Sequence, residues 1–229
     1  MTAEVAGREL CRILLKSIAH ETPHFPSNHS LKRLRLGGSS GVANKSLTRL
    51  PESLGDLASL EELCLDKCKH LKTLPSSIGK LSKLSKLYLR ECKGLVILPP
   101  TIVRCKNLVE LSLLKCQNLK NLPADIGQLT LLEELSCMKC KELKEIPRSI
   151  GCCEHLSILD LRVCKSLTAL PDEIGSLSRL RCLQLDDCTS LAEVPELVSM
   201  LPKLEVLTAG NCNFKSLPES MRQLLHTAS

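Results

Sequence analysis

A proline recurs at a fixed interval along most of this 229-residue chain, and the interval constrains the fold more than any other feature. Six successive spacings are 24 residues and the seventh is 23, counted between Leu-Pro or equivalent pairs that end at Pro51, Pro75, Pro99, Pro123, Pro147, Pro171, Pro195 and Pro218. Self-similarity at a period of about 20 to 50 residues is typical of solenoids and related repeat architectures. A unit this small cannot bury its own apolar side chains, so stacked neighbours must share one core.

Each repeat follows the pattern L-x-x-L-x-L-x-x-C-x-x-L-x-x-L-P-x-x-I-G-x-L-x-x, as in the segment from Leu84 to Asn107. This is the leucine-rich-repeat pattern. Its central L-x-L places leucine at every second residue, which predicts a short strand with one buried face. The residue before proline is biased towards extended backbone. In the x-x-I-G-x-L that follows, the spacing of Ile and Leu predicts a short helical turn.

We therefore predict an α/β leucine-rich-repeat solenoid, a horseshoe with a parallel β-sheet on the concave face and short helices or 3-10 turns on the convex face. Eight repeats occupy residues 31–225, and the first has an extra Gly- and Ser-rich loop at 37–46. Residues 1–30 are predicted to form an N-terminal cap helix and linker, because apolar side chains there have helical spacing. Residues 226–229 form a short tail.

Composition and charge exclude several classes of protein. Charged residues make up 24% of the chain and hydrophobic residues 43%, which is too apolar for a disordered chain. No apolar run reaches the roughly 18 residues of a membrane helix, so we expect no membrane association. The formal net charge is +6, but residues 51–229 hold 23 basic against 22 acidic residues. This balance, and a total of three aromatic residues, predict no nucleic-acid partner.

Fourteen cysteines raise the alternatives of disulfides, zinc binding and catalysis. Half of them occupy the column where leucine-rich repeats place Asn or Cys, and a small buried thiol there can hydrogen-bond the backbone. We interpret this column as a structural ladder formed by Cys68, Cys92, Cys116, Cys140, Cys164, Cys188 and Cys212. Cys105 and Cys153 replace a leucine of the outer turn, and Cys137 replaces a strand leucine. Cys64 and Cys182 fall in exposed strand columns.

So many unpaired thiols indicate a reducing compartment, so we expect a cytoplasmic location, with the nucleus as the alternative. We expect no metal and no other cofactor. Catalytic motifs such as G-x-x-x-x-G-K-[S/T] and G-x-S-x-G do not occur in the sequence, and its six histidines are scattered. An enzyme would need a constellation of residues that persists across coils, so we predict a non-enzymatic protein.

The predicted functional surface is the concave face of the sheet, where variable columns alternate with fixed leucines. We expect a protein partner there and a monomeric chain, with an ordinary solvated surface as the alternative. Tyr88 and Arg90 are the expected anchor, because Tyr and Arg are enriched at hot spots. The predicted binding residues are Arg33, Arg35, Glu62, Asp66, Lys86, Tyr88, Arg90, Glu110, Leu114, Met138, Ile158, Asp160, Arg162, Gln184 and Asp186.

A basic edge is the second surface feature of the repeats. Lysines precede or follow several ladder cysteines, at positions 67, 69, 93, 115, 139, 141 and 165. Such an edge has the charge to dock an acidic partner, and a solvated edge is the alternative.

The string LPSSIGKLSKLSKLYLRECKGLVILP, at residues 74–99, closely resembles the repeat region of plant intracellular nucleotide-binding immune receptors, the disease-resistance proteins. The resemblance covers about residues 31–225. It implies a role in plant defence: sensing a pathogen effector or a modified host protein and holding a nucleotide-binding domain inactive. No P-loop occurs in this sequence, so nucleotide hydrolysis is not implied. Two alternatives stay open: a repeat scaffold for a small GTPase or signalling complex, and a repeat fragment without its own ligand.

Overall fold

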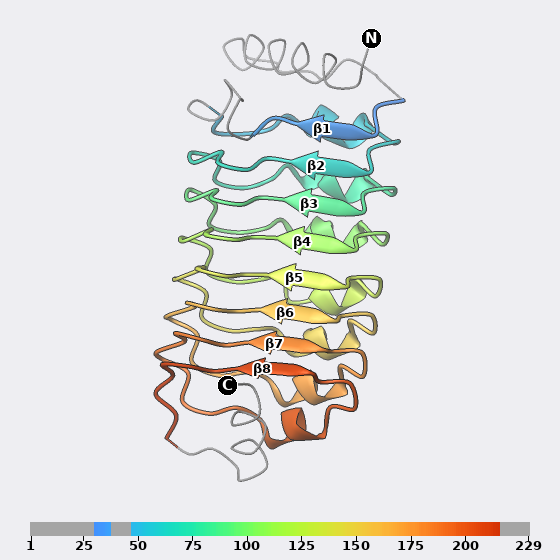
Figure 1. Cartoon of the computed structure of the whole chain (residues 1–229). Helices are drawn as coiled ribbons and strands as arrows, with labels where there is room; N and C mark the ends of the chain where they lie inside the picture. The colour runs from blue at the N-terminus through green and yellow to red at the C-terminus, as the bar shows by residue number, and fades with distance from the viewer. Residues whose placement is uncertain (1–29, 38–46, 216–229) are drawn as a thin grey trace.

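The computed structural model describes residues 30–37 and 47–215, and in this part of the chain a single parallel sheet has eight strands in sequence order (Figure 1). Each strand has three residues. The strands are β1 (Arg33–Arg35), β2 (Glu62–Cys64), β3 (Lys86–Tyr88), β4 (Glu110–Ser112), β5 (Glu134–Ser136), β6 (Ile158–Asp160), β7 (Cys182–Gln184) and β8 (Val206–Thr208). The predicted cap helix, the loop at 38–46 and the C-terminal tail lie outside the described residues.

The strands pair in the register that the repeat predicts. The central leucine of each strand pairs with the central leucine of the next, from Leu34 and Leu63 at one end to Leu183 and Leu207 at the other. Each column of the repeat is therefore a straight row of side chains across the sheet. All these central leucines are buried, and the leucine, isoleucine and ladder-cysteine columns form one continuous core.

The outer turns opposite the sheet are 3-10 helices (Figure 1). They are η2 (Glu52–Asp56), η3 (Ser76–Lys80), η4 (Pro100–Arg104), η5 (Ile126–Gln128), η6 (Arg148–Cys152), η7 (Asp172–Ser176) and η8 (Glu196–Met200). Most of them begin directly after a proline with extended backbone, such as Pro75 with ψ of 152°. Hydrogen bonds such as Ile78 N–H to the Pro75 carbonyl, at 3.1 Å, give the tight 3-10 geometry. The predicted solenoid fold is confirmed.

A sharp turn follows each of the strands β2 to β8, at the residue before the ladder cysteine. Seven such residues have positive φ although none is glycine: Lys67, Glu91, Lys115, Lys139, Val163, Asp187 and Asn211. The left-handed region costs a non-glycine residue about 1 to 2 kcal/mol. The turn aims the backbone N–H at the next coil, as in the 2.7 Å bond from Lys115 N–H to the Met138 carbonyl. These residues line the edge where the strands end.

Candidate functional site

The first coils of the sheet face carry charges that neutralise one another. Arg33 and Arg35 lie beside each other on β1, and both reach Glu62 on β2, at 3.7 and 2.9 Å. Lys86 lies 3.6 Å from Glu110 one coil further along. These residues belong to the predicted site, and the structure brings them together as cross-strand ion pairs.

Tyr88 and Arg90, the predicted anchor, are held in place by carboxylates. The Arg90 guanidinium lies 5.2 Å from the centre of the Tyr88 ring, within the range of a cation–π contact. Its Nε and Nη2 atoms donate to Asp66 at 2.8 and 2.7 Å. The Tyr88 hydroxyl donates to Glu110 at 2.7 Å. Burial and the Glu110 carboxylate raise the pKa of Tyr88, so this hydroxyl stays a donor.

Three aspartates of the predicted site make internal hydrogen bonds. Asp66 and Asp160 are buried, with 8% and 7% of their surface exposed. Asp66 also accepts the Arg90 backbone N–H at 2.9 Å, and Asp160 binds the Arg162 guanidinium through two bonds of 2.9 Å. Asp186 accepts the hydroxyl of Thr208 on the next strand. The carboxylates of Asp66 and Asp160 therefore bind arginine side chains, whereas that of Asp186 binds the hydroxyl of Thr208 and the backbone N–H of Gly210.

The centre of the sheet face has a different character. Leu114, Met138 and Ile158 are half-buried there, as the apolar centre that the sequence predicts. Glu134 lies on the same face, on β5, between Glu110 and Ile158 in the sheet register. Within the described residues the Glu134 carboxylate has no cation within 4.0 Å and no hydrogen-bond partner. Burial and the nearby carboxylates of Glu110 and Asp160 raise its pKa.

Glu134 was not among the predicted binding residues, although its column was. The signal that could have found it is its cross-strand neighbour Glu110, because like charges on adjacent strands destabilise a sheet. Glu110 is itself compensated by Lys86 and by the Tyr88 hydroxyl, so the carboxylate of Glu134 is the unpaired member of this pair. Gln184, a predicted residue on β7, is half-buried further along the same face.

The prediction that Cys64 is exposed is wrong. Cys64 has 8% of its surface exposed, because its register neighbours Arg35 and Tyr88 carry long side chains on either side of it. Cys182, in the neighbouring column, is half-buried.

The ladder cysteines bind carbonyl groups of the preceding coil. Cys116 Sγ donates to the Leu89 carbonyl at 3.0 Å, and Cys140 Sγ to that of Leu113 at 3.2 Å. The same bond occurs at Cys92, Cys164, Cys188 and Cys212. The thirteen cysteines of the described segments are all free thiols.

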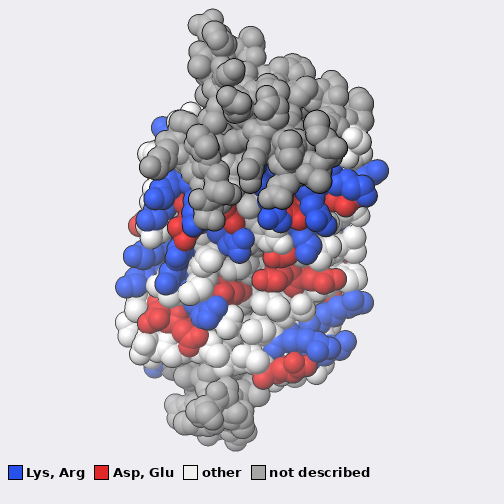
Figure 2. Space-filling model, turned by 45° about the horizontal axis from the view of Figure 1, so that its top comes forward, with Lys and Arg blue, Asp and Glu red and all other residues white. Residues whose placement is uncertain are grey.

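The surface of the described segments carries charges of both signs. Figure 2 shows basic and acidic side chains interleaved over one view of the surface. In residues 30–37 and 47–215, no group of three or more His, Cys, Asp or Glu side chains is placed to hold a metal ion. Over those segments, no helix has the length and apolarity to cross a membrane.

Comparison with known proteins identifies the fold. No protein-family model matches the chain, and no curated protein sequence matches it. A leucine-rich-repeat protein of Leptospira interrogans is similar to it, with 30% identity and a TM-score of 0.72 over 92% of this chain. The leucine-rich-repeat domain of the type III effector XopL matches 82% of this chain with 28% identity and a TM-score of 0.55.

These two neighbours share the leucine-rich-repeat fold with this chain, and neither is a plant immune receptor. The chain spans 61% of the length of the Leptospira protein and 73% of the XopL domain.

Proposed function

We propose that this chain is a non-enzymatic protein-recognition module whose partner binds the face of the sheet. The observation that carries the proposal is the contrast between columns of that face. The buried strand column is leucine in every coil from Leu34 to Leu207, whereas the exposed columns beside it change from coil to coil. Leucine-rich-repeat solenoids present such extended surfaces for binding, and this supports the proposal.

The centre of the contact, in this proposal, is Glu134 with the apolar side chain of its cross-strand neighbour Ile158. An unpaired, half-buried carboxylate beside Ile158, on a face that also carries Leu114 and Met138, suits a partner that offers a lysine or arginine next to an apolar group. The prearranged Tyr88–Arg90 pair lies towards the N-terminal end of the same face and would extend the contact.

The sequence resemblance supports a more specific role. We propose that the module senses an effector or a modified host protein and restrains a signalling domain, as the repeat domain of plant disease-resistance proteins does. The free buried thiols support a reducing location, the cytoplasm or the nucleus.

The test starts with capture of partners from plant extract by the wild-type chain, followed by affinity measurement with each purified partner. We expect Glu134→Lys to lower the affinity for a true partner at least about tenfold, because the substitution places a cation where the partner's cation binds. Glu133→Lys is the matched control, since Glu133 is an exposed neighbour that precedes β5.

Equal affinity of both variants would refute the sheet-face site. Binding that depends on GTP rather than GDP in the partner would favour the small-GTPase scaffold. Failure to capture any protein beyond those that a Leu135→Asp unfolded control captures would favour a fragment without its own ligand.

A further inference from the structure

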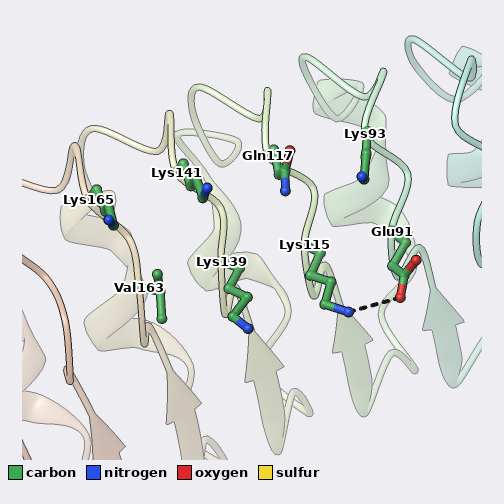
Figure 3. A pocket seen from close by; sticks show the side chains of 8 residues that line it. All are labelled: Glu91, Lys93, Lys115, Gln117, Lys139, Lys141, Val163 and Lys165. Atoms are coloured by element: carbon green, nitrogen blue, oxygen red, sulfur yellow. Dashed lines mark hydrogen bonds and ion pairs between the residues drawn. The ribbon is translucent and has the colours of Figure 1, made fainter.

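A groove of about 360 Å³ lies at the edge of the sheet, where the strands end and the chain turns towards the ladder cysteines (Figure 3). It is separate from the columns of the sheet face that the proposed function uses. Its charged lining consists of one glutamate, Glu91, and five lysines, Lys93, Lys115, Lys139, Lys141 and Lys165.

The lysines stand in two rows that the repeat itself generates (Figure 3). Lys115 and Lys139 are residues with positive φ at the strand ends, and their backbone N–H groups are fixed by bonds to the next coil. Lys93, Lys141 and Lys165 follow the ladder cysteines on the adjoining turns. Lys115 and Lys139 lie on neighbouring coils, and so do Lys141 and Lys165. Because neighbouring strands lie about 4.8 Å apart, the members of each of these two pairs are closer than the Debye length of about 8 Å. Solvent ions therefore screen their repulsion only in part.

The groove has little internal compensation for this charge. Lys115 Nζ lies 3.0 Å from Glu91, and this bond lowers the pKa of the Glu91 carboxyl. The other four lysines have no carboxylate within 4.0 Å anywhere in the described segments. Five lysines against one glutamate leave a formal charge of +4, although residues 51–229 have only one basic residue in excess.

We propose that this groove binds a compact anion with two or more phosphate groups, that is, a polyphosphorylated small molecule. Lysine ammonium groups bind phosphate oxygens as point charges from several directions. No arginine lines the groove, so the planar fork that best recognises carboxylates is missing from it. The volume lies at the small end of ligand pockets, which hold about 300 to 1,000 Å³. A single phosphate, with a charge of about −2, would leave about half of the net charge of the groove uncompensated.

Tripolyphosphate is the probe, titrated calorimetrically into the whole chain at constant physiological ionic strength. We expect saturable 1:1 binding to the wild type and a loss of about tenfold in affinity for Lys139→Gln/Lys141→Gln, which removes one charge from each row. Lys120→Gln/Lys144→Gln is the control: it makes the same charge change at exposed positions on adjacent coils outside the groove, and we expect it to keep wild-type affinity. Circular dichroism verifies that both variants are folded.

A parallel titration with ATP distinguishes a nucleotide from free polyphosphate as the source of the phosphates, and tight binding of either supports the site. Equal losses in the two double variants would overturn it, because the effect would then follow net charge alone. Absence of saturable binding to the wild type would also overturn it. So would binding of an acidic peptide such as oligoglutamate in place of both phosphate compounds, which would assign the groove to a protein segment.

Discussion

At the scale of single residues, the cysteines connect one coil to the next. The Leu89 carbonyl accepts both the Cys92 N–H of its own coil, at 3.1 Å, and the Cys116 thiol of the following coil, at 3.0 Å. Two further cysteines do the same in the outer turns, where Cys105 donates to the Ile78 carbonyl at 3.2 Å and Cys153 to that of Ile126 at 3.6 Å. A thiol thus fills an apolar column and bonds a neighbouring coil.

The outer-turn thiols should make stability sensitive to alkaline pH. Burial raises the pKa of Cys105 and of Cys153 from the ordinary value of 9.0 to about 12. Between these values the unfolded chain releases protons that the folded chain keeps. The contribution of the two thiols to the free energy of unfolding is therefore fully present below pH 9 and is lost as the pH rises towards 12. The loss is about 1.4 kcal/mol for each thiol and each pH unit.

The variant Cys105→Leu/Cys153→Leu restores the leucine that the column holds at Leu81 and Leu129. We expect its free energy of unfolding to fall less steeply than that of the wild type between pH 9 and 10.5. Urea denaturation in the presence of a reductant measures both slopes, and comparison with the wild type cancels the titration of lysines. If the free energy of unfolding fell equally steeply with pH in the variant and in the wild type, Cys105 and Cys153 would not be the source of the alkaline sensitivity.

At the scale of elements, glycine sets how closely the outer turns stack. A Cβ atom on Gly127 would lie 1.9 Å from the Ser149 carbonyl oxygen of the next turn. In η4 a valine, Val103, takes the place of this glycine and is buried. The turn that follows it, η5, has three residues, whereas the other outer turns of the described segments have five. The shortened turn thus follows the coil in which a branched side chain stands in the glycine column.

Gly127→Ala should therefore destabilise the protein. The new methyl group forces η5 and η6 apart, and overpacking of this kind costs about 1 to 3 kcal/mol. Gly210→Ala is the control, because a Cβ there would meet only the tip of the Asp186 side chain, at 3.1 Å. Guanidinium denaturation of both variants gives the comparison, and similar losses of stability would show that the close approach at Gly127 is unimportant.

The sequence predicted the elements well because their causes are local and periodic. Leucine at alternate positions marks the strands, and proline marks the start of the outer turns. The positive φ of Lys67 and Val163 could not be predicted, since no glycine marks those positions and only the carbonyl of the next coil makes the turn favourable. The burial of Cys64 and the unpaired state of Glu134 likewise could not be predicted. Both depend on the way in which the long side chains of neighbouring residues lie across the sheet face.

At the scale of the whole molecule, the strands and outer turns of residues 30–37 and 47–215 pack against those of the neighbouring coils. The sheet order is sequential, and every strand between β1 and β8 pairs with its two neighbours in sequence. The free energy of unfolding of such a solenoid is close to the sum of the intrinsic stabilities of its coils and the interaction energies between neighbouring coils. The position of a defect along the stack should then decide its effect.

Two matched truncations test this dependence on position. Leu135 is fully buried on β5, between coils on both sides, and Leu207 is 4% exposed on β8, the last strand of the sheet. We expect Leu135→Ala to cost about 3 kcal/mol and to broaden or split the urea transition, because it weakens two interfaces in the middle of the stack. Leu207→Ala should cost less, since the last coil can open while the others stay folded.

Hydrogen exchange resolved by peptide locates the opening in each variant. Protection should fall around β4 to β6 for Leu135→Ala and only around β8 for Leu207→Ala. A uniform loss of protection along the chain in both variants, with equal shifts of the urea midpoint, would mean that the coils unfold as one unit. A recognition surface spread over several coils would then respond to damage anywhere in the stack. With local opening, the Glu134 region of the sheet face keeps its geometry when the terminal coil opens.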